Sequence, residues 1–475
     1  MRRVVFPLLI LIATCSFSAH AATYSLTNDG AWTWFNDPRA IVDGNSLLSG
    51  WVTLDGHIMA GRFDLTTHAT TTVDLYGQFF QSDDHDNPAF LKNPDGTFTA
   101  FFAPHGGASV RVRNFSLNPN GSFSLGSLST LSESSQVSGS NGWTYANPYR
   151  LSSENKTYLF SRGPNFNPVY RVRDDATGAW GAAKTFISNP NQRPYVKYDS
   201  NNTDRVGFTF TDAHPRNVDN NIYYAYMKNG AYWRADNTKI KDLSAGPITP
   251  ADMSGSIGTI WNHTQHVPTQ GDNSWVWDIA TDPTGHPVIA FTTFPDDLHH
   301  QYHWARWTGT SWDDYVIMNN AGPYIGASSE GNYSAGIALD HTDPTIVYQS
   351  WQNAGTWNLQ QWKLNTDGQT WSTDLIANGF GPADENIRPY VPLNRPADTE
   401  LVMWLRGQYD YWNLSSGVGY DTGVQLWMNH QPAGLGGDSS PIVPEPTLGL
   451  APLAILLLRR RRAPSPPDSS TFISP

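Results

Sequence analysis

Residues 85–102 read HDNPAFLKNPDGTFTAFF, and this stretch has the form of a β-hairpin. Two apolar, alternating runs flank Asn93-Pro94-Asp95-Gly96, four residues that favour a tight turn between strands. Six other stretches share the arrangement, each with an extended run, a turn, an apolar strand and a strand rich in Trp or Tyr. The seven stretches begin at Trp34, His85, Tyr145, Arg193, Val276, Asn332 and Ile387.

The repeat predicts the fold class. A strand–turn–strand unit that recurs every roughly 40 to 60 residues is typical of a β-propeller blade, which has four strands. The chain is rich in Trp, Tyr, Gly, Asn and Asp, which favours strands and tight turns, and no long stretch has a helical period. The sequence therefore predicts an all-β, seven-bladed β-propeller. A pair of β-sandwiches or a β-helix remains the alternative.

The first 21 residues have the form of a secretory signal peptide. Arg2 and Arg3 precede a short apolar run, and Ala19-His20-Ala21 is a small-x-small cleavage site. A lipoprotein signal that uses Cys15 is the alternative. Because Cys15 is the only cysteine, cleavage after Ala21 would leave a mature protein without disulfides or thiol chemistry.

The C-terminal segment carries a second sorting pattern. Val443-Pro444-Glu445-Pro446 precedes an apolar run, Leu448–Leu458, and then Arg459–Arg462. The run is shorter than the roughly 20 residues of a self-sufficient membrane span, and the arginines would stay on the cytoplasmic side. This arrangement resembles the PEP-CTERM sorting signal, which implies delivery to the outer surface or extracellular matrix of a Gram-negative bacterium. Contact with the membrane would then be transient; an ordinary tail anchor is the alternative.

These signals predict the organisation of the whole chain. We expect a signal peptide at 1–21, a propeller at 22–435, a linker at 436–443, a sorting segment at 444–462 and a disordered tail at 463–475. The net charge is −12, and the propeller is more negative still because both sorting segments are basic. We therefore expect a monomer with no nucleic-acid partner, which binds an anionic ligand only through a locally basic cleft.

The predicted geometry gathers polar side chains at one end of the propeller channel. Four of them stand at the starts of units, and these are His85, Tyr145, Arg193 and Arg388. His105 and Arg162 stand where the second strand of a unit ends, which is at the same rim after one hairpin. We therefore expect His85 to lie beside His105, and Tyr145 beside Arg162.

These residue types suit a β-elimination on a uronic acid. Histidine takes or gives a proton near neutral pH, and a tyrosine beside an arginine should have its phenolate form favoured. Arginine binds a carboxylate through two parallel hydrogen bonds. In the reaction, a base removes the C5 proton, a cation neutralises the adjacent carboxylate, and an acid protonates the leaving glycosidic oxygen.

Several motifs carry a family resemblance that spans about residues 30–430. DDHDNPAF (83–90), APHGG (103–107), TYANP (144–148) and YLFSRG (158–163) resemble the propeller polysaccharide lyases active on ulvan, families 24 and 25, and the wider BNR-4 repeat proteins. The resemblance implies a lyase that cleaves a uronate-containing anionic polysaccharide.

The resemblance also implies roles for single residues. His85 and Tyr145 would form the acid–base pair, Arg162 would neutralise the carboxylate, and His105 would contact the substrate. Three further residues are candidate substrate contacts: Arg193, Arg388 and Tyr149. Tyr149 is also a nearby alternative to Tyr145 in the motif.

No cofactor is required for this chemistry, but a structural zinc or calcium ion remains possible. Lyases of this kind can carry a structural zinc, and cysteine ligands are absent from the body of this chain. Four histidines are the candidate substitutes: His214, His299, His300 and His303.

Two rival functions remain open. A sialidase-like glycosidase would need Asp-box repeats and a tyrosine–glutamate pair, and the chain has one degenerate box, Asn365–Trp371, with Glu330 and Glu385 as candidate glutamates. A non-catalytic surface propeller that binds polysaccharide or another matrix component is the second rival, because the fold does not by itself imply catalysis.

Overall fold

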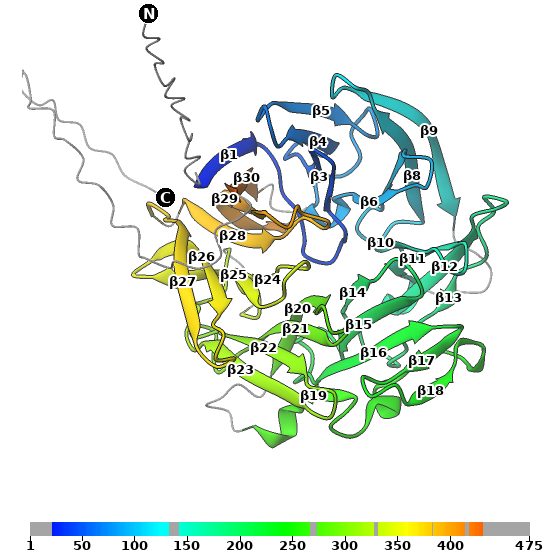
Figure 1. Ribbon diagram of the computed structural model, residues 1–475, viewed down its shortest axis with the longest axis vertical. Helices are drawn as coiled ribbons and strands as arrows, with labels where there is room; N and C mark the ends of the chain where they lie inside the picture. Colours follow the sequence, from blue (N-terminus) through cyan, green and yellow to red (C-terminus); the bar gives the residue numbers. More distant parts are fainter. Residues whose placement is uncertain are drawn as a thin grey trace, which may run out of the picture. The chain divides into compact units, whose positions relative to one another are not determined.

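The computed structural model describes residues 21–132, 142–266, 273–326, 331–381, 383–413 and 418–430. Within them, seven antiparallel sheets follow one another around a common centre, as the colour sequence in Figure 1 shows. The prediction of an all-β, seven-bladed propeller is confirmed. The predicted signal peptide and C-terminal sorting segment lie outside the described residues, apart from Ala21.

The first four blades each begin with the strand that lies nearest the centre. The first blade contains β2 (Ala40–Asp43), β3 (Ser46–Val52), β4 (Ile58–Asp64) and β5 (Thr70–Asp74). The second contains β6 (Ala89–Lys92), β7 (Phe98–Phe102), β8 (Ser109–Leu117) and β9 (Phe123–Ser132). The third contains β10 (Thr144–Leu151), β11 (Lys156–Arg162), β12 (Pro168–Asp174) and β13 (Lys184–Thr185). The fourth contains β14 (Val196–Ser200), β15 (Arg205–Thr211), β16 (Ile222–Lys228), β17 (Ala231–Trp233), β18 (Lys239–Asp242) and β19 (Thr259–Trp261).

The last three blades complete the circle. The fifth contains β20 (Ser274–Thr281), β21 (Pro287–Thr293), β22 (Gln301–Trp307) and β23 (Trp312–Met318). The sixth contains β24 (Ile337–Leu339), β25 (Ile346–Asn353), β26 (Thr356–Leu364) and β27 (Trp371–Ala377). The seventh contains β28 (Glu385–Tyr390), β29 (Thr399–Asn413), β30 (Val418–His430) and β1 (Ala21–Thr27). Short 3-10 turns lie in loops from the second blade to the start of the fifth: η1 (Asp84–Asp86), η2 (Pro164–Phe166), η3 (Leu243–Ala245), η4 (Pro250–Met253) and η5 (His263–Gln265).

The seventh blade closes the ring by joining the two ends of the propeller chain. Its outermost strand is β1, which pairs antiparallel with β30, so Tyr24 lies opposite Leu426 (Figure 1). This pairing covers the edge of β30, which would otherwise be open to aggregation.

Turn chemistry defines the repeated hairpins. Between β6 and β7, the Asn93 amide donates to the Thr97 carbonyl at 2.8 Å, and Gly96 has φ of 84°, a conformation that favours glycine. The hairpin of β20 and β21 has the same pattern, with Gly285 at φ of 87°. The predicted turns therefore lie where the sequence motif placed them.

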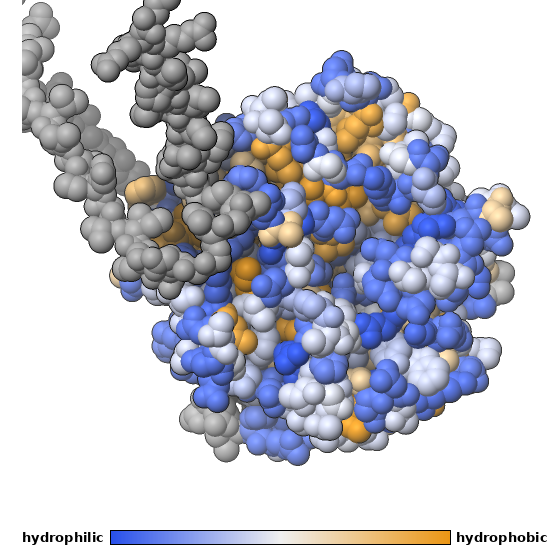
Figure 2. Space-filling view, in the orientation of Figure 1, coloured by the Kyte–Doolittle hydropathy of each residue, from blue (hydrophilic) through white to orange (hydrophobic). Residues whose placement is uncertain are grey.

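Burial is greatest in strands near the propeller axis and falls toward the outer strands. All six residues of β28 are buried, whereas β9, at the edge of its blade, is largely exposed. Hydrophilic side chains accordingly dominate the face seen in Figure 2, where apolar ones show mainly over β3, β4 and β6. Among the described residues, no helix has the length and apolar character needed to cross a membrane.

A segment of the first repeat passes through the centre and fills the channel. Trp34 stacks on Trp277 with ring centroids 4.3 Å apart, and its indole nitrogen donates to the Val276 carbonyl. Further along, Asp37 pairs with Arg39 at 3.0 Å and with Lys197 of β14. The three ionic side chains are at most 8% exposed, so they form a buried network between the first and fourth blades.

A second buried ionic group joins the fourth, fifth and sixth blades. His341 Nε2 lies 3.1 Å from Asp278, and its Nδ1 lies 3.7 Å from Asp199. Burial by itself lowers the pKa of His341, but the charges and hydrogen bonds of Asp278 and Asp199 outweigh it and raise the pKa to about 10.

This shift predicts how stability depends on pH. Because the pKa of His341 is raised on folding, its contribution is fully present below pH 6.5, its usual pKa, and is lost as pH rises through about 10. We expect the free energy of unfolding to fall across this window, and to fall less in His341→Gln, as measured by chemical denaturation at each pH. His299→Gln, at an exposed histidine, is the control and should keep the wild-type dependence. Equal pH slopes for His341→Gln and the wild type would contradict the prediction.

Candidate functional site

Irregularities in two inner strands aim side chains into one end of the channel. The pairing of β10 with β11 shifts register between Thr144 and Asn147, and Tyr145 there has φ of 60°. The pairing of β28 with β29 shifts in the same way, and Arg388 has φ of 52°. A bulge re-aims a side chain, and a left-handed non-glycine residue costs about 1–3 kcal/mol. Such strain in two blades at one pocket is typical of a functional site.

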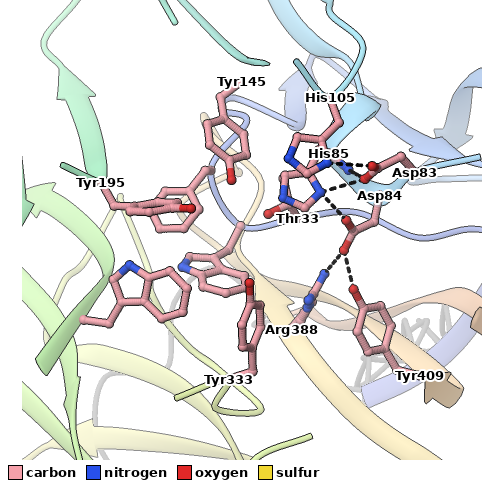
Figure 3. A pocket seen from close by; sticks show the side chains of 13 residues that line it. Thr33, Asp83, Asp84, His85, His105, Tyr145, Tyr195, Tyr333, Arg388 and Tyr409 are labelled. Carbon is pink, nitrogen blue, oxygen red and sulfur yellow. Dashed lines mark hydrogen bonds and ion pairs between the residues drawn. The ribbon is translucent and has the colours of Figure 1, made fainter. Parts of the chain in front are cut away.

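The pocket at this end is lined from at least five blades and from the segment that fills the channel (Figure 3). Its polar side chains converge on a small space, and its floor is aromatic. The lining residues are Thr33, Trp34, Phe35, Asp83, Asp84, His85, His105, Tyr145, Tyr195, Trp275, Tyr333, Arg388 and Tyr409.

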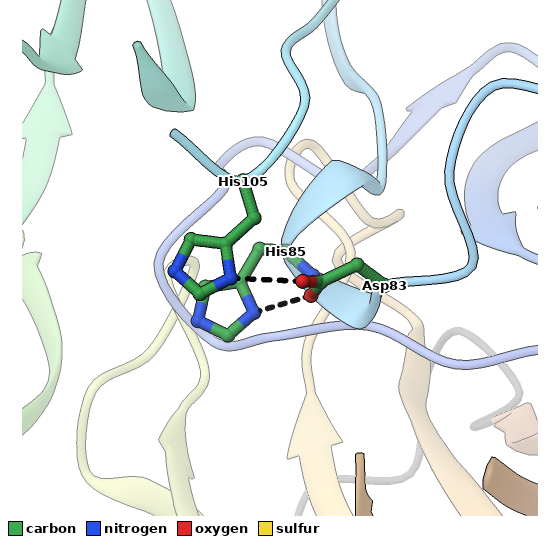
Figure 4. A group of neighbouring side chains, drawn as sticks. All are labelled: Asp83, His85 and His105. Atoms are coloured by element: carbon green, nitrogen blue, oxygen red, sulfur yellow. Dashed lines mark hydrogen bonds and ion pairs between the residues drawn. The ribbon is translucent and has the colours of Figure 1, made fainter. Parts of the chain in front are cut away.

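His85 and His105 lie together, as expected from the hairpin geometry. Their rings stack with centroids 4.0 Å apart and an interplanar angle of 5° (Figure 4). Each Nδ1 donates to a different oxygen of Asp83, at 2.7 Å for His85 and 2.8 Å for His105. One buried carboxylate therefore orients both imidazoles, and neither Nε2 has a hydrogen-bond partner among the described residues.

A second carboxylate, Asp84, contacts the same Nδ1 of His85. It lies 2.7 Å from His85 Nδ1 and also accepts from Arg388 and Tyr409 (Figure 3). Burial alone would raise the pKa of Asp84, but the charges of Arg388 and His85 hold it well below its usual range. Asp84 is therefore a stable anion at the base of the pocket.

The two histidines differ in charge because of these surroundings. Burial lowers the pKa of His85, but Asp83 and Asp84 outweigh it and raise this pKa to about 10. The charge of His85, together with burial, then lowers the pKa of His105 below 6.5. At neutral pH, His85 is an imidazolium, and His105 is a neutral imidazole whose Nε2 lone pair has no donor among the described residues.

Tyr145 stands beside this pair and beside Arg162. Its ring lies 5.4 Å from that of His85, and the Arg162 guanidinium lies 4.8 Å from its ring centroid. Burial and the neighbouring Tyr195 raise the pKa of Tyr145 well above the usual value, and Arg162 only partly offsets them. The expectation of a favoured phenolate is therefore wrong, because desolvation outweighs the arginine charge and keeps the phenol protonated.

The predicted arginine contacts have different surroundings. Arg162 donates to Thr144 Oγ1 at 3.0 Å and forms no ion pair with a described residue, and Arg193 lies 4.1 Å from the Phe166 ring. Arg388 lines the pocket, but its Nη1 donates to the Asp84 carboxylate and to the Trp32 carbonyl, so it supports Asp84.

Tyr149 is wrong as a substrate contact. Its ring is buried in the core between the third and fourth blades, and its hydroxyl donates to the Tyr198 carbonyl at 3.0 Å. Because β10 is regular beyond its bulge, the side chain at 149 points into the sheet interface instead of the channel.

The four histidines considered for a metal do not form one site. His299 pairs with exposed Asp296, His300 contacts the Gly331 carbonyl and Ser334, and His303 contacts Asp314. Within the described ranges, the one group of three or more clustered metal-ligating side chains is Asp83, His85 and His105. A structural zinc or calcium ion stays a prediction.

The glutamates considered for a glycosidase give no tyrosine–glutamate pair in the described part of the pocket. Glu385 is buried and accepts from the Tyr409 backbone amide, while Glu330 lies outside the described residues.

Comparison with known proteins places the chain in a family. The profile of BNR_4, described as "BNR repeat-containing family member", matches residues 48–320, more than half of the sequence. The chain belongs to this family. A comparison with curated proteins gives no match.

Solved structures similar to this BNR_4 propeller include polysaccharide lyases. One is a PL25 ulvan lyase bound to -[GlcA(1-4)Rha3S]-, with 12% identity, a TM-score of 0.60, and coverage of 84% of this chain and 94% of that chain. Another is polysaccharide lyase Uly1, with 13% identity, a TM-score of 0.50, and coverage of 87% and 99%. At such identity, the likeness establishes the shared propeller fold.

Sequence reasoning missed several residues of the pocket. Asp83 and Asp84 directly precede His85, so their place in the chain was a usable signal. Tyr195 stands at a unit start, as Arg193 does, and was passed over. Tyr409 lies 325 residues from its partner Asp84, and nothing in its local sequence indicates the contact.

Proposed function

We propose that the protein is a polysaccharide lyase that cleaves a uronate-containing anionic polysaccharide by β-elimination. One observation carries the proposal: a neutral histidine, a protonated tyrosine and an imidazolium share a pocket, and the Arg162 guanidinium lies 4.8 Å from the ring centroid of that tyrosine. Base, acid and carboxylate-neutralising charge are the three elements that the reaction needs. The shared fold with an ulvan lyase supports the substrate class.

The charges of the site assign a role to each group. The His85 imidazolium and Arg162 bind the uronate carboxylate, which makes the C5 proton more acidic. His105 Nε2 takes this proton, while Asp83 holds its Nδ1–H. The C4–O bond breaks, the Tyr145 hydroxyl gives its proton to the leaving oxygen, and a C4=C5 double bond remains. Arg162 then stabilises the phenolate until solvent returns its proton, and His105 releases the C5 proton to solvent.

This assignment revises the acid–base pair suggested by family resemblance. His85 was expected to pair with Tyr145, but a histidine with a pKa of about 10 is a poor base at neutral pH. His105 was expected only to contact substrate, yet it has the free lone pair and the more exposed side chain, 39% against 21% for His85.

The first experiment measures product formation directly. Purified protein is mixed with a panel of uronate polysaccharides, ulvan first, and the ultraviolet absorbance of the conjugated C4=C5 bond is followed. A rise on at least one polymer is expected. Binding without any rise would overturn the lyase proposal and favour the non-catalytic carbohydrate-binding propeller.

The pH profile separates the two histidines. Because His105 must be neutral and its pKa is lowered, we expect kcat/KM to rise with pH and level off below pH 6.5. In His85→Gln the neighbouring charge is gone, so the residual activity should rise at a higher pH, nearer the ordinary histidine value. Wild-type activity that rises only near pH 10 would instead make neutral His85 the base.

We also propose that the protein works outside the cytoplasm, because both ends of the chain resemble export and sorting signals. Fractionation of the native host followed by immunodetection tests this. Detection only in the cytoplasm would contradict it.

A further inference from the structure

The loop between β11 and β12 holds an aromatic side chain in a strained backbone. Asn165 and Phe166 are consecutive left-handed residues, with φ of 58° and 60°, inside η2. For a bulky residue such as Phe, this conformation is a true outlier and strains the backbone. Phe166 belongs to none of the hydrophobic core clusters of the described residues, so core packing does not explain the strain.

Two guanidinium groups lie against the Phe166 ring. Arg162 lies 5.4 Å from the ring centroid and Arg193 lies 4.1 Å from it. The ring therefore holds the two cations at a set spacing, since a guanidinium is attracted to an aromatic face. Arg162 also lies over the ring of Tyr145, which lines the pocket. Arg162 therefore stands between the pocket and Phe166, and Arg193 lies against the same Phe166 ring.

Arg193 has no anionic partner among the described residues. It forms no hydrogen bond or ion pair with any residue in the described part of the chain, and its side chain is only partly exposed. Arg150 and Arg173 of the third blade are, by contrast, both paired with Asp175. A chain with 42 acidic and 30 basic residues has thus kept this cation unneutralised next to the pocket.

A surface cavity of about 610 Å³ opens beside Arg193. Carboxamides dominate its lining, and it contains no carboxylate. They are Asn165, Asn167, Asn191, Gln192 and Asn217. Carboxamides both donate and accept hydrogen bonds, so they suit sugar hydroxyls, and Arg193 supplies the single positive charge.

We propose that this cavity is a second sugar-binding position, in which Arg193 binds an anionic substituent on a unit near the one that reacts. Phe166 is a positioning residue that holds Arg193 at a set distance from Arg162. The anion is a carboxylate or a sulfate ester, both of which a guanidinium binds through two parallel hydrogen bonds. The inference rests on the proposed function and deepens it: the substrate carries acidic groups on more than one unit within reach of the site.

The test measures binding and turnover separately. Binding of a fully charged polymer such as ulvan is followed by calorimetry for the wild type, Arg193→Gln and Phe166→Leu. A hydrogen-bonded charge is worth about 1.5–3 kcal/mol, so Arg193→Gln should weaken binding about tenfold or more and reduce its dependence on ionic strength. Phe166→Leu should give a smaller loss of the same kind. In turnover assays both should raise KM and leave kcat near the wild-type value.

A matched control lies on the same blade. Arg173 also stacks on an aromatic ring, Trp180 at 5.9 Å, but it is paired with Asp175 away from the cavity. Arg173→Gln should bind and turn over as the wild type does. Chemically desulfated and carboxyl-reduced polymers identify the anion, because the deficit of Arg193→Gln should vanish with the polymer that lacks the bound group.

The outcomes separate this inference from the proposed lyase. Lyase activity with unchanged binding and KM in Arg193→Gln would overturn the second position alone. Absence of lyase activity, with binding lost in Arg193→Gln but not in Arg173→Gln, would overturn the lyase and keep the position. If the wild type binds none of the polymers, both the lyase proposal and the second sugar-binding position are contradicted.

Discussion

Tyr145→Phe lowers kcat about 10²- to 10⁴-fold on any polymer that the wild type cleaves, which is the range that a positioned acid or base contributes. The change removes one hydroxyl and leaves the ring against Arg162 and His85, so substrate binding should change little. The left-handed backbone at this position is equally available to Phe and Tyr. The measurement is the initial rate of ultraviolet absorbance at saturating substrate, with binding measured in parallel.

Tyr149→Phe is the matched control for this change. It lies in the same strand and loses the same atom, but its hydroxyl contacts the Tyr198 carbonyl in the core. We expect an unchanged kcat and a loss of about 1 kcal/mol in the free energy of unfolding. Equal kcat values for Tyr145→Phe and the wild type would remove Tyr145 from the chemistry.

Asp37→Asn should lower the free energy of unfolding by about 3–5 kcal/mol, because it leaves the buried cations Arg39 and Lys197 without their anion. The pKa of Asp37 is lowered despite its burial, because Arg39 and Lys197 outweigh desolvation, so the carboxylate is ionised in the folded protein. Chemical denaturation followed by tryptophan fluorescence measures the loss.

Asp43→Asn is the matched control for the buried network. Asp43 pairs with Lys92 at the surface, where the two side chains are 35% and 46% exposed. Such a pair is worth about 0–1 kcal/mol, so the variant should remain close to the wild type. Similar losses in the two variants would mean that the network in the channel contributes no more than a surface pair does.

Local sequence was enough to predict the blades, because the signals are local. A hairpin such as that of β6 and β7 depends on alternating apolar residues and on Asn93-Pro94-Asp95-Gly96, all within one short stretch. The proximity of His85 and His105 was predictable for the same reason, because one hairpin returns the chain to the same rim. Tyr145 and Arg162 are paired by the next hairpin in the same way.

Contacts between distant segments were not predictable. The pairing of β1 with β30, the passage of Trp34 through the channel and the contact of Asp84 with Tyr409 join residues hundreds of positions apart. No local pattern specifies such partners, because each depends on how seven blades close around one axis.

The sequence by itself determined the number of blades and the rim at which His85, His105, Tyr145 and Arg162 meet, because strand period and turn residues act over a few positions. Only the tertiary structure decided the protonation states of these groups at neutral pH. A protonation state depends on burial and on every nearby charge, and for His85 these come from Asp83 and from an Asp84 that Arg388 and Tyr409 hold in place. The folded propeller thereby makes one histidine of the pair a cation and leaves the other a base.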